Sequence, residues 1–280
     1  MYRVSKVLNN NGVIAIDMDE NKEYVILGKG VGFGKKVSQR FDKPEGCTTY
    51  RLEQETERGS AKELVKGIEP EYLEIADAIL TESQKVFGDS IDRGILFPLA
   101  DHISFAVARI RRNEQISNPL TEDIKVLFYS EFKVAETLKT ILRERLQIEI
   151  DDHEVGYVAL HIHSAIGDEK VSVAMQTARA VRECIDMIEK ATGKPIDVLS
   201  LSYNRLMNHM KYMVARASTG EKLNLDMNEY MLDQYPQAYK VATDICKNLE
   251  GCIGHKLDET ETGYLACLLY TSDAADDRIS

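Results

Sequence analysis

The first 52 residues alternate short apolar runs with turn residues, whereas the rest of the chain follows a helical pattern. Runs rich in β-branched and aromatic side chains predict strands at residues 2–8, 13–18, 23–27 and 47–52. Asn11-Gly12 separates the first two runs and favours a type I′ hairpin, because both central residues of that turn need a positive φ. We therefore expect a small antiparallel sheet of roughly 50 residues, a size that gains much stability from dimerisation.

Beyond residue 52 the apolar positions recur at intervals of three and four, as on one face of a helix. The first such stripe comprises Tyr72, Ile75, Ile79, Leu80, Ser83 and Val86. Further stripes begin at Leu99 and Leu138, and the acidic residues 151–152 precede a helix expected over 153–166. Residues 167–170 interrupt this pattern and mark a boundary between helical segments.

Two parts of the helical region match each other at one fixed sequence separation, which we call the repeat offset. Residues 99–103 match 206–210, residues 132–135 match 239–242, and residues 154–159 match 261–266. A period as long as a small domain indicates a tandem domain duplication, because solenoid repeats span only roughly 20–50 residues. The duplication places His102 and His209 at equivalent positions, so the repeat offset is the separation between these two histidines.

These patterns predict an α+β multidomain protein, with a small antiparallel sheet followed by two all-α helical bundles. The sheet domain is expected to cover residues 1–56, and a polar linker residues 57–67. The first bundle is expected over residues 68–170 and the second over 171–266.

The repeat register fails near the C-terminus, where Leu268 stands at the position equivalent to His161. Residues 267–280 resemble the in-frame translation of a transposon-type sequencing adaptor, and we expect this tail to be non-native. On this interpretation the second bundle is incomplete and lacks a fourth regulatory histidine. It also lacks part of its last helix, which would expose core surface around Tyr264 and Leu265.

Composition narrows the class of protein. Hydrophobic residues make up 44 % of the chain, and no apolar run approaches the roughly 18 residues of a membrane span. The N-terminus does not begin as a signal peptide. The five cysteines form no C-x-x-C pair, which suits a reducing compartment and argues against a zinc site. We therefore expect a cytoplasmic protein with no cofactor, no metal and no membrane contact.

Charge is distributed unevenly along the chain. Residues 1–52 hold nine Lys/Arg against six Asp/Glu, a balance of +3, whereas the remainder carries −14. A basic module joined to an acidic body indicates that only the N-terminus contacts a polyanion. The alternative is that a balance of +3 is ordinary scatter.

Residues 28–36 follow a strand and are rich in glycine and lysine. They do not form a dinucleotide-binding loop, because Phe33 stands where that fingerprint needs glycine and the polar residues 37–44 are turn-like rather than helical. The loop could instead offer N–H groups and lysines to phosphates, and Phe33 to a stacking base. The alternative is a surface loop with Phe33 packed into the core.

Lys6, the asparagine turn at residues 9–11 and this loop resemble the co-antiterminator RNA-binding domain of the sugar-operon transcriptional antiterminators. That family joins the domain to two phosphotransferase-system regulation domains in tandem. The resemblance implies a homodimer that binds an RNA hairpin and prevents a terminator from forming. The RNA contacts that it implies are Lys6, Asn11, Gly28, Lys29 and Phe33. Arginine also suits the position of Lys29. A lysine there would lack the planar bidentate contact that arginine can make.

The same resemblance implies that His102, His161 and His209 are phosphorylation sites. A sugar-specific enzyme II would phosphorylate the first repeat and thereby inhibit the antiterminator. The histidine phosphocarrier protein would phosphorylate the second repeat and thereby activate it. Neutral imidazole is a good phosphoryl acceptor near neutral pH. Metal binding by the first two histidines is an alternative, but no compact ligand set accompanies them. The remaining histidines, His153, His163 and His255, are expected to be structural.

The sequence thus favours an RNA-binding transcriptional antiterminator that accepts phosphate and catalyses no reaction. One rival is a DNA-binding activator with the same regulation domains, which needs a helix-turn-helix ahead of the repeats. A second rival is a phosphocarrier enzyme, which needs a nucleophile–base set that the sequence does not display.

Overall fold

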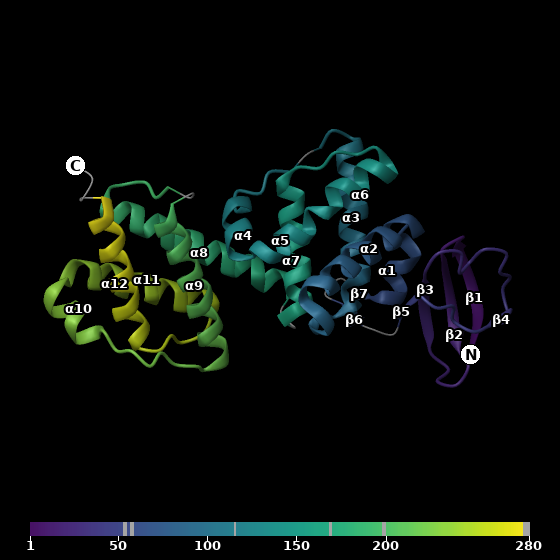
Figure 1. The fold of residues 1–280 in the computed structure, drawn as a ribbon, viewed down its shortest axis with the longest axis horizontal. Coiled ribbons are helices and arrows are strands. Elements are labelled where there is room, and N and C mark those ends of the chain that lie inside the picture. Colours follow the sequence, from purple (N-terminus) through teal and green to yellow (C-terminus); the bar gives the residue numbers. More distant parts are fainter. Residues whose placement is uncertain (53–54, 57–58, 115, 168–169, 198–199, 277–280) are drawn as a thin grey trace. The chain divides into compact units, whose positions relative to one another are not determined.

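The computed structural model describes residues 1–280 apart from 53–54, 57–58, 115, 168–169, 198–199 and 277–280. Its N-terminal module is a five-stranded antiparallel sheet with the strand order β4-β1-β2-β3-β5 (Figure 1). The strands are β1 (Tyr2–Asn9), β2 (Gly12–Asp17), β3 (Glu23–Leu27), β4 (Arg40–Phe41) and β5 (Thr48–Arg51). Helices dominate the remainder, so the expected fold class, a small sheet followed by helical domains, is confirmed.

Turn chemistry and a shared apolar core account for the sheet. β1 and β2 pair with Asn9 opposite Gly12, so Asn10 and Asn11 are the central residues of the turn. The type I′ turn predicted at Asn11-Gly12 is wrong, because neither of these residues has a positive φ. Asn21 has a φ of 56° in the second hairpin, a conformation that asparagine tolerates better than most residues. The core of this module comprises Val4, Val13, Ala15, Ile26, Val31, Phe41 and Cys47.

Strand β4 corrects the prediction that residues 37–44 are turn-like throughout. Arg40 and Phe41 pair with Arg3 and Tyr2 of β1, and the Phe41 side chain is buried. A strand of two residues shows no alternating pattern in the sequence, because alternation needs at least four residues to be recognised.

The segment 57–67, expected to be a polar linker, contains regular structure. β6 (Glu55–Thr56) and β7 (Gly59–Ser60) form a short antiparallel pair, and α1 (Ala61–Gly67) follows directly. Ala61 and Val65 of α1 are buried. The linker prediction is therefore wrong for residues 59–67, because two buried residues at one-turn spacing are too few to produce a visible stripe.

The first helical repeat begins with α2 (Pro70–Phe87), which packs against α3 (Leu96–Arg111). Proline at the start of α2 suits a position whose N–H has no helical partner, and Gly88 ends the helix with a φ of 67°. The predicted apolar stripe is buried from Tyr72 to Ser83, whereas Val86 is exposed. Short 3₁₀ turns at Gly88–Ser90 and Arg93–Ile95 connect α2 to α3. The repeat continues with α4 (Thr121–Leu127), α5 (Tyr129–Ala135), α6 (Thr137–Leu146) and α7 (Asp152–Gly167).

The chain forms two compact units whose borders differ from those of the repeats. One unit comprises residues 1–118 and 130–171, and the other comprises residues 119–129 and 172–280. Helix α4 therefore belongs to the second unit, although it lies within the first repeat. Within that unit Tyr203 donates a hydrogen bond to the buried Asp123 carboxylate of α4, at 2.8 Å.

The second repeat reproduces the first at the predicted separation. Its helices are α8 (Val171–Thr192), α9 (Leu201–Thr219), α10 (Asn228–Gln234), α11 (Pro236–Ile253) and α12 (Thr260–Asp276). Helix α10 follows α4 at the repeat offset at both of its ends, and α11 spans the positions equivalent to α5 and α6 together. The duplication seen in the sequence is therefore present in the secondary structure.

Helix α12 contradicts the prediction of a shortened last helix. It continues through residue 276, and Leu265, Ala266 and Leu269 are buried rather than exposed. Leu265 and Leu269 lie one turn apart on one face, and α12 packs against α10 and α11. Helix formation across the predicted tail needs only this apolar face and residues such as alanine and leucine with high helix propensity.

Candidate functional site

The glycine-rich loop, residues 28–36, is hydrogen-bonded to the asparagine turn between β1 and β2. The Gly28 N–H donates to the Asn11 carbonyl oxygen at 2.9 Å, and the Gly32 N–H donates to the Asn10 carbonyl oxygen at 2.9 Å. The Gly30 N–H donates to the side-chain oxygen of Asn11 at 2.9 Å. A Cβ at Gly32 would lie 2.0 Å from the Asn9 carbonyl oxygen, so only glycine permits this approach.

Phe33 lies on this loop with 73 % of its surface exposed. The alternative that Phe33 packs into the core is therefore wrong. Lys29 is also exposed, and Lys6 is exposed on β1 at a shift in the pairing register with β2. The structure thus brings Asn11, Gly28, Lys29 and Phe33 together, and it places Lys6 on the adjoining strand.

Gly28 has a packing role that the sequence does not reveal. A Cβ at this position would lie 2.4 Å from the Cys47 sulfur and 3.0 Å from its Cα. Glycine is therefore required by the core of the sheet as well as by any close approach of a ligand to the backbone.

A carboxylate of the first helical repeat holds the asparagine turn. Glu74 of α2 accepts a hydrogen bond from the Asn9 side-chain amide at 2.7 Å and from that of Asn11 at 3.1 Å. Arg145 lies 3.7 Å from the same carboxylate. The Asn11 side chain thus accepts a hydrogen bond from the glycine loop through its oxygen and donates one to Glu74 through its nitrogen.

His102 lies on α3 in a buried, charged environment. Its Nε2 atom is 3.6 Å from the Glu154 carboxylate of α7, which accepts two contacts from the Arg109 guanidinium, at 2.9 and 3.2 Å. His161, also on α7, faces His102 with ring centroids 5.3 Å apart, and Tyr157 lies 5.7 Å away. The two predicted acceptors of the first repeat therefore share one site.

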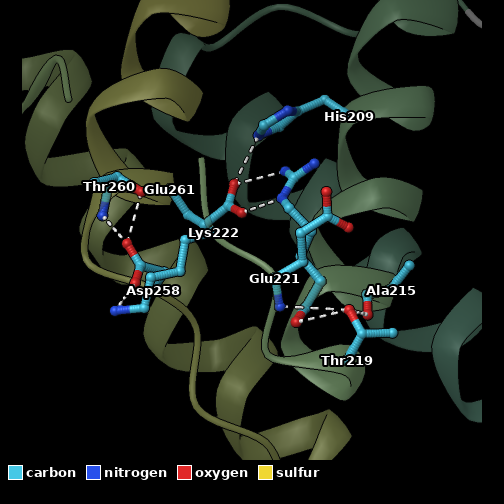
Figure 2. A network of polar contacts seen from close by, with 9 residues as sticks. His209, Ala215, Thr219, Glu221, Lys222, Asp258, Thr260 and Glu261 are labelled. Atoms are coloured by element: carbon cyan, nitrogen blue, oxygen red, sulfur yellow. Dashed lines mark hydrogen bonds and ion pairs between the residues drawn. The ribbon is translucent and has the colours of Figure 1, made fainter. Parts of the chain in front are cut away.

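His209 of α9 has the equivalent environment in the second repeat. Its Nε2 atom lies 3.8 Å from the Glu261 carboxylate at the start of α12, as Figure 2 shows. Arg216 binds that carboxylate through two nitrogens, Nε at 2.6 Å and Nη2 at 2.9 Å. The Tyr264 ring lies 4.7 Å from the imidazole, at the position equivalent to Tyr157. A second network nearby links Lys222 and Thr260 to Asp258 (Figure 2).

Burial and the arginines control the titration of these sites. Burial, and secondarily the positive Arg216, lower the pKa of His209 to about 4. Burial opposes ionisation of Glu154, but the nearby His102 and Arg109 outweigh it and the pKa of the carboxyl is lowered. A neutral imidazole therefore lies beside a glutamate–arginine ion pair in the second repeat at neutral pH.

The remaining histidines have different surroundings. His163 Nδ1 lies 2.9 Å from the Glu131 carboxylate, and His153 Nδ1 lies 3.2 Å from the Asn118 carbonyl oxygen. His255 is exposed. Among the described residues, no group of three or more His, Cys, Asp or Glu side chains could hold a metal ion. In that part of the chain no helix is long and apolar enough to cross a membrane.

Four residues of these sites were not predicted from the sequence: Glu74, Glu154, Arg216 and Glu261. The repeat register contains the signal for three of them, because Arg216 follows Arg109, and Glu261 follows Glu154, at the same repeat offset as the histidines. Glu74 has no such signal, since Val181 stands at the equivalent position.

Comparison with known proteins identifies both parts of the chain. Residues 2–59 match the CAT RNA binding domain, and residues 77–165 and 182–272 each match the PRD domain. The chain belongs to this family of CAT–PRD proteins. The two PRD matches confirm the tandem duplication, and the CAT match covers the predicted sheet domain.

Two relatives match this chain along nearly their whole length. The GlcA/glcB genes antiterminator of Staphylococcus carnosus is 30 % identical over 270 residues, which cover 94 % of this chain and 93 % of the relative. Transcription antiterminator LicT of Bacillus subtilis is 26 % identical over 267 residues, covering 94 % and 96 %. The crystal structure of GlcT CAT-PRDI is 29 % identical in sequence, with a TM-score of 0.52. The match covers 59 % of this chain and 98 % of the GlcT chain.

Proposed function

We infer that this CAT–PRD protein is an RNA-binding transcription antiterminator whose PRD domains are regulated by the phosphotransferase system. The match to the CAT RNA binding domain carries this inference, and the full-length relatives are antiterminators by name. A DNA-binding activator is not favoured, because it needs a helix-turn-helix ahead of the repeats and the described part of residues 1–60 contains strands. As a regulator of this kind the chain accepts phosphate and catalyses no reaction.

We propose that the loop and the asparagine turn form the RNA interface. The exposed Phe33 ring offers a stacking surface to an unpaired base, and Lys6 and Lys29 offer positive charge to phosphates. Asn11 supplies an amide that can read a base edge once it leaves Glu74. Gly28 allows the backbone to approach the RNA closely. The partner is an RNA hairpin, bound by a homodimer in the cytoplasm.

Phosphorylation of His102, His161 and His209 controls this interface in our proposal. The first two share one buried site, which suits control by a single donor, a sugar-specific enzyme II. His209 stands apart in the second repeat and is assigned to the histidine phosphocarrier protein. A phosphoryl group adds close to two negative charges to a site that already holds a glutamate, so it changes the packing of the helices around it.

Gel shifts of the full chain on a leader-RNA hairpin test the RNA interface. Phe33→Ala is expected to weaken binding by about 1–3 kcal/mol through lost stacking. Phe105→Ala is a matched control, since that ring is 57 % exposed on α3 and lies outside the proposed interface. Equal affinity of Phe33→Ala and the parent would contradict the assignment of the loop.

A further inference from the structure

Each repeat places a partly buried arginine and a buried glutamate beside its histidine, and all three positions recur at the repeat offset. The histidine and the arginine are seven residues apart on one helix, which is two turns and therefore one face. The glutamate comes from the first turn of the last helix of the repeat, α7 or α12. The same three charged or titratable groups thus meet twice in one chain.

In both copies the glutamate carboxylate lies directly against the Nε2 atom of the histidine. The distance is 3.6 Å from Glu154 to His102 and 3.8 Å from Glu261 to His209. Both Nε2 atoms are buried and make no hydrogen bond to any described residue. A phosphoryl group on either nitrogen would occupy the space that the carboxylate now fills, and it would carry the same sign of charge.

We propose that Arg109 and Arg216 bind the phosphoryl group of the modified histidine and release their glutamate to do so. This inference rests on the proposed phosphorylation. In that step the Nε2 lone pair forms a bond to phosphorus while the nitrogen–phosphorus bond of the donor phosphohistidine breaks. The electron pair of the broken bond returns to the donor ring. The guanidinium fork fits the phosphoryl oxygens as well as it fits a carboxylate, so one cation serves either anion.

The displaced glutamate connects phosphorylation to the fold. Glu154 and Glu261 are 3 % and 1 % exposed, and a buried carboxylate without its cation is strongly unfavourable. Each must move toward water or take up a proton when its arginine leaves. Because each lies in the first turn of its helix, the movement acts on the start of α7 or α12.

The two repeats differ in how the arginine binds the glutamate that it would release. Arg216 binds Glu261 with two nitrogens, whereas Arg109 reaches Glu154 with one terminal nitrogen only. The Arg109 Nε atom is buried and makes no hydrogen bond to a described residue, so it is available to a phosphoryl oxygen. The first repeat should therefore exchange its arginine at lower cost than the second.

The test uses the full chain labelled with phosphoramidate, a small phosphoryl donor that needs no partner protein. The ³¹P signal of each phosphohistidine is titrated with pH, because a guanidinium in contact lowers the pKa of the phosphoryl group. The variants are Arg216→Gln/Glu261→Gln and Arg109→Gln/Glu154→Gln, which remove both charges together. Arg143→Gln/Glu149→Gln is the matched control, since that exposed pair has similar contacts of 2.7 and 3.3 Å.

We expect the titration midpoint of phospho-His209 to rise by about one pH unit in Arg216→Gln/Glu261→Gln, and to stay unchanged in the control. Arg216→Lys, which keeps the charge without the fork, should give an intermediate midpoint and decides the matter if the double variant does not fold. If the titration midpoint of the phosphohistidine is unchanged in the folded variants, the proposed binding of the phosphoryl group by the arginine is overturned, but the phosphorylation proposal is not. A parent chain that takes no phosphate on His102 or His209 overturns the phosphorylation proposal as well.

Discussion

In the first repeat His102 faces a second histidine, His161, whereas in the second repeat Leu268 stands at the equivalent position and His209 packs against Tyr264. The glutamate and the arginine are common to both sites, but only Arg216 binds its glutamate as a two-nitrogen fork. The two sites therefore share the charged pair but differ in the imidazoles beside it. The first site has two imidazoles near Arg109. The second has one imidazole near Arg216, which binds its glutamate through two nitrogens.

The first helices of the two repeats differ in a way that follows from their neighbours. Helix α2 carries Glu74, which accepts hydrogen bonds from the asparagine turn, and Asp77, which accepts one from Tyr50 of β5. The equivalent positions in α8 are Val181 and Cys184, and both are buried. The first repeat thus uses this helix face to bind the sheet, while the second uses it as core.

The largest expected effect comes from breaking the ion pair of the second repeat. Glu261→Ala leaves Arg216 as a largely buried charge without a partner and should destabilise its unit by about 3–5 kcal/mol. Glu154→Ala should cost less, because Arg109 is 25 % exposed against 15 % for Arg216. Hydrogen exchange resolved by unit in increasing urea measures both. An equal loss in the two variants would contradict the difference in pairing.

The sequence predicts much of the fold and of the two histidine sites. The asparagine turn marks the position of the first hairpin, although not the predicted turn type, and the repeat offset gives the paired domains and two of the histidine positions. Arg216 and Glu261 follow Arg109 and Glu154 at the same offset, so the register holds most of the site. The ion pairs themselves need the fold, because 45 residues separate their partners.

Other features leave no local pattern. Helix α1 and strand β4 are too short for a periodicity to appear, and Glu74 is one of many glutamates on a helix surface. Its contact with Asn9 joins residues 65 positions apart. The apolar face formed by Leu265 and Leu269 is visible in the sequence, but the repeat register does not predict it, because the register fails at Leu268.

The pH dependence of the second unit should report on His209. Its pKa is about 4 in the folded chain and about 6.5 in an unfolded one, so the unfolded state binds more protons between these values. The contribution of His209 to stability is therefore constant above pH 6.5 and falls as the pH decreases toward 4, by up to about 3 kcal/mol. His209→Asn should remove this part of the slope in denaturant unfolding from pH 7 to 4. A variant with the slope of the parent would contradict the burial of a neutral imidazole.

Replacing Leu268 by histidine is expected to make the second site more like the first. The repeat register places residue 268 where His161 faces His102, so Leu268→His should add one phosphoryl acceptor beside His209. Intact-mass spectrometry at neutral pH, after labelling with phosphoramidate, counts the phosphates. Cys267→His, one position out of register, is the control and should add none at this site. An unchanged count in Leu268→His would show that the surroundings of the second site differ beyond this one residue.

The smallest expected effect concerns the contact that only the first repeat makes. Glu74→Gln weakens the hydrogen bonds from Asn9 and Asn11 by removing the charge of their acceptor, and so frees the Asn11 amide that we assign to RNA. The full chain should then bind the leader hairpin about five-fold more tightly, which corresponds to about 1 kcal/mol. Glu71→Gln on the same helix is the matched control for the loss of one negative charge, and it should change affinity less. If both variants gain equally, general electrostatic attraction to RNA accounts for the effect, and the hydrogen bonds to Glu74 do not restrain the asparagine turn.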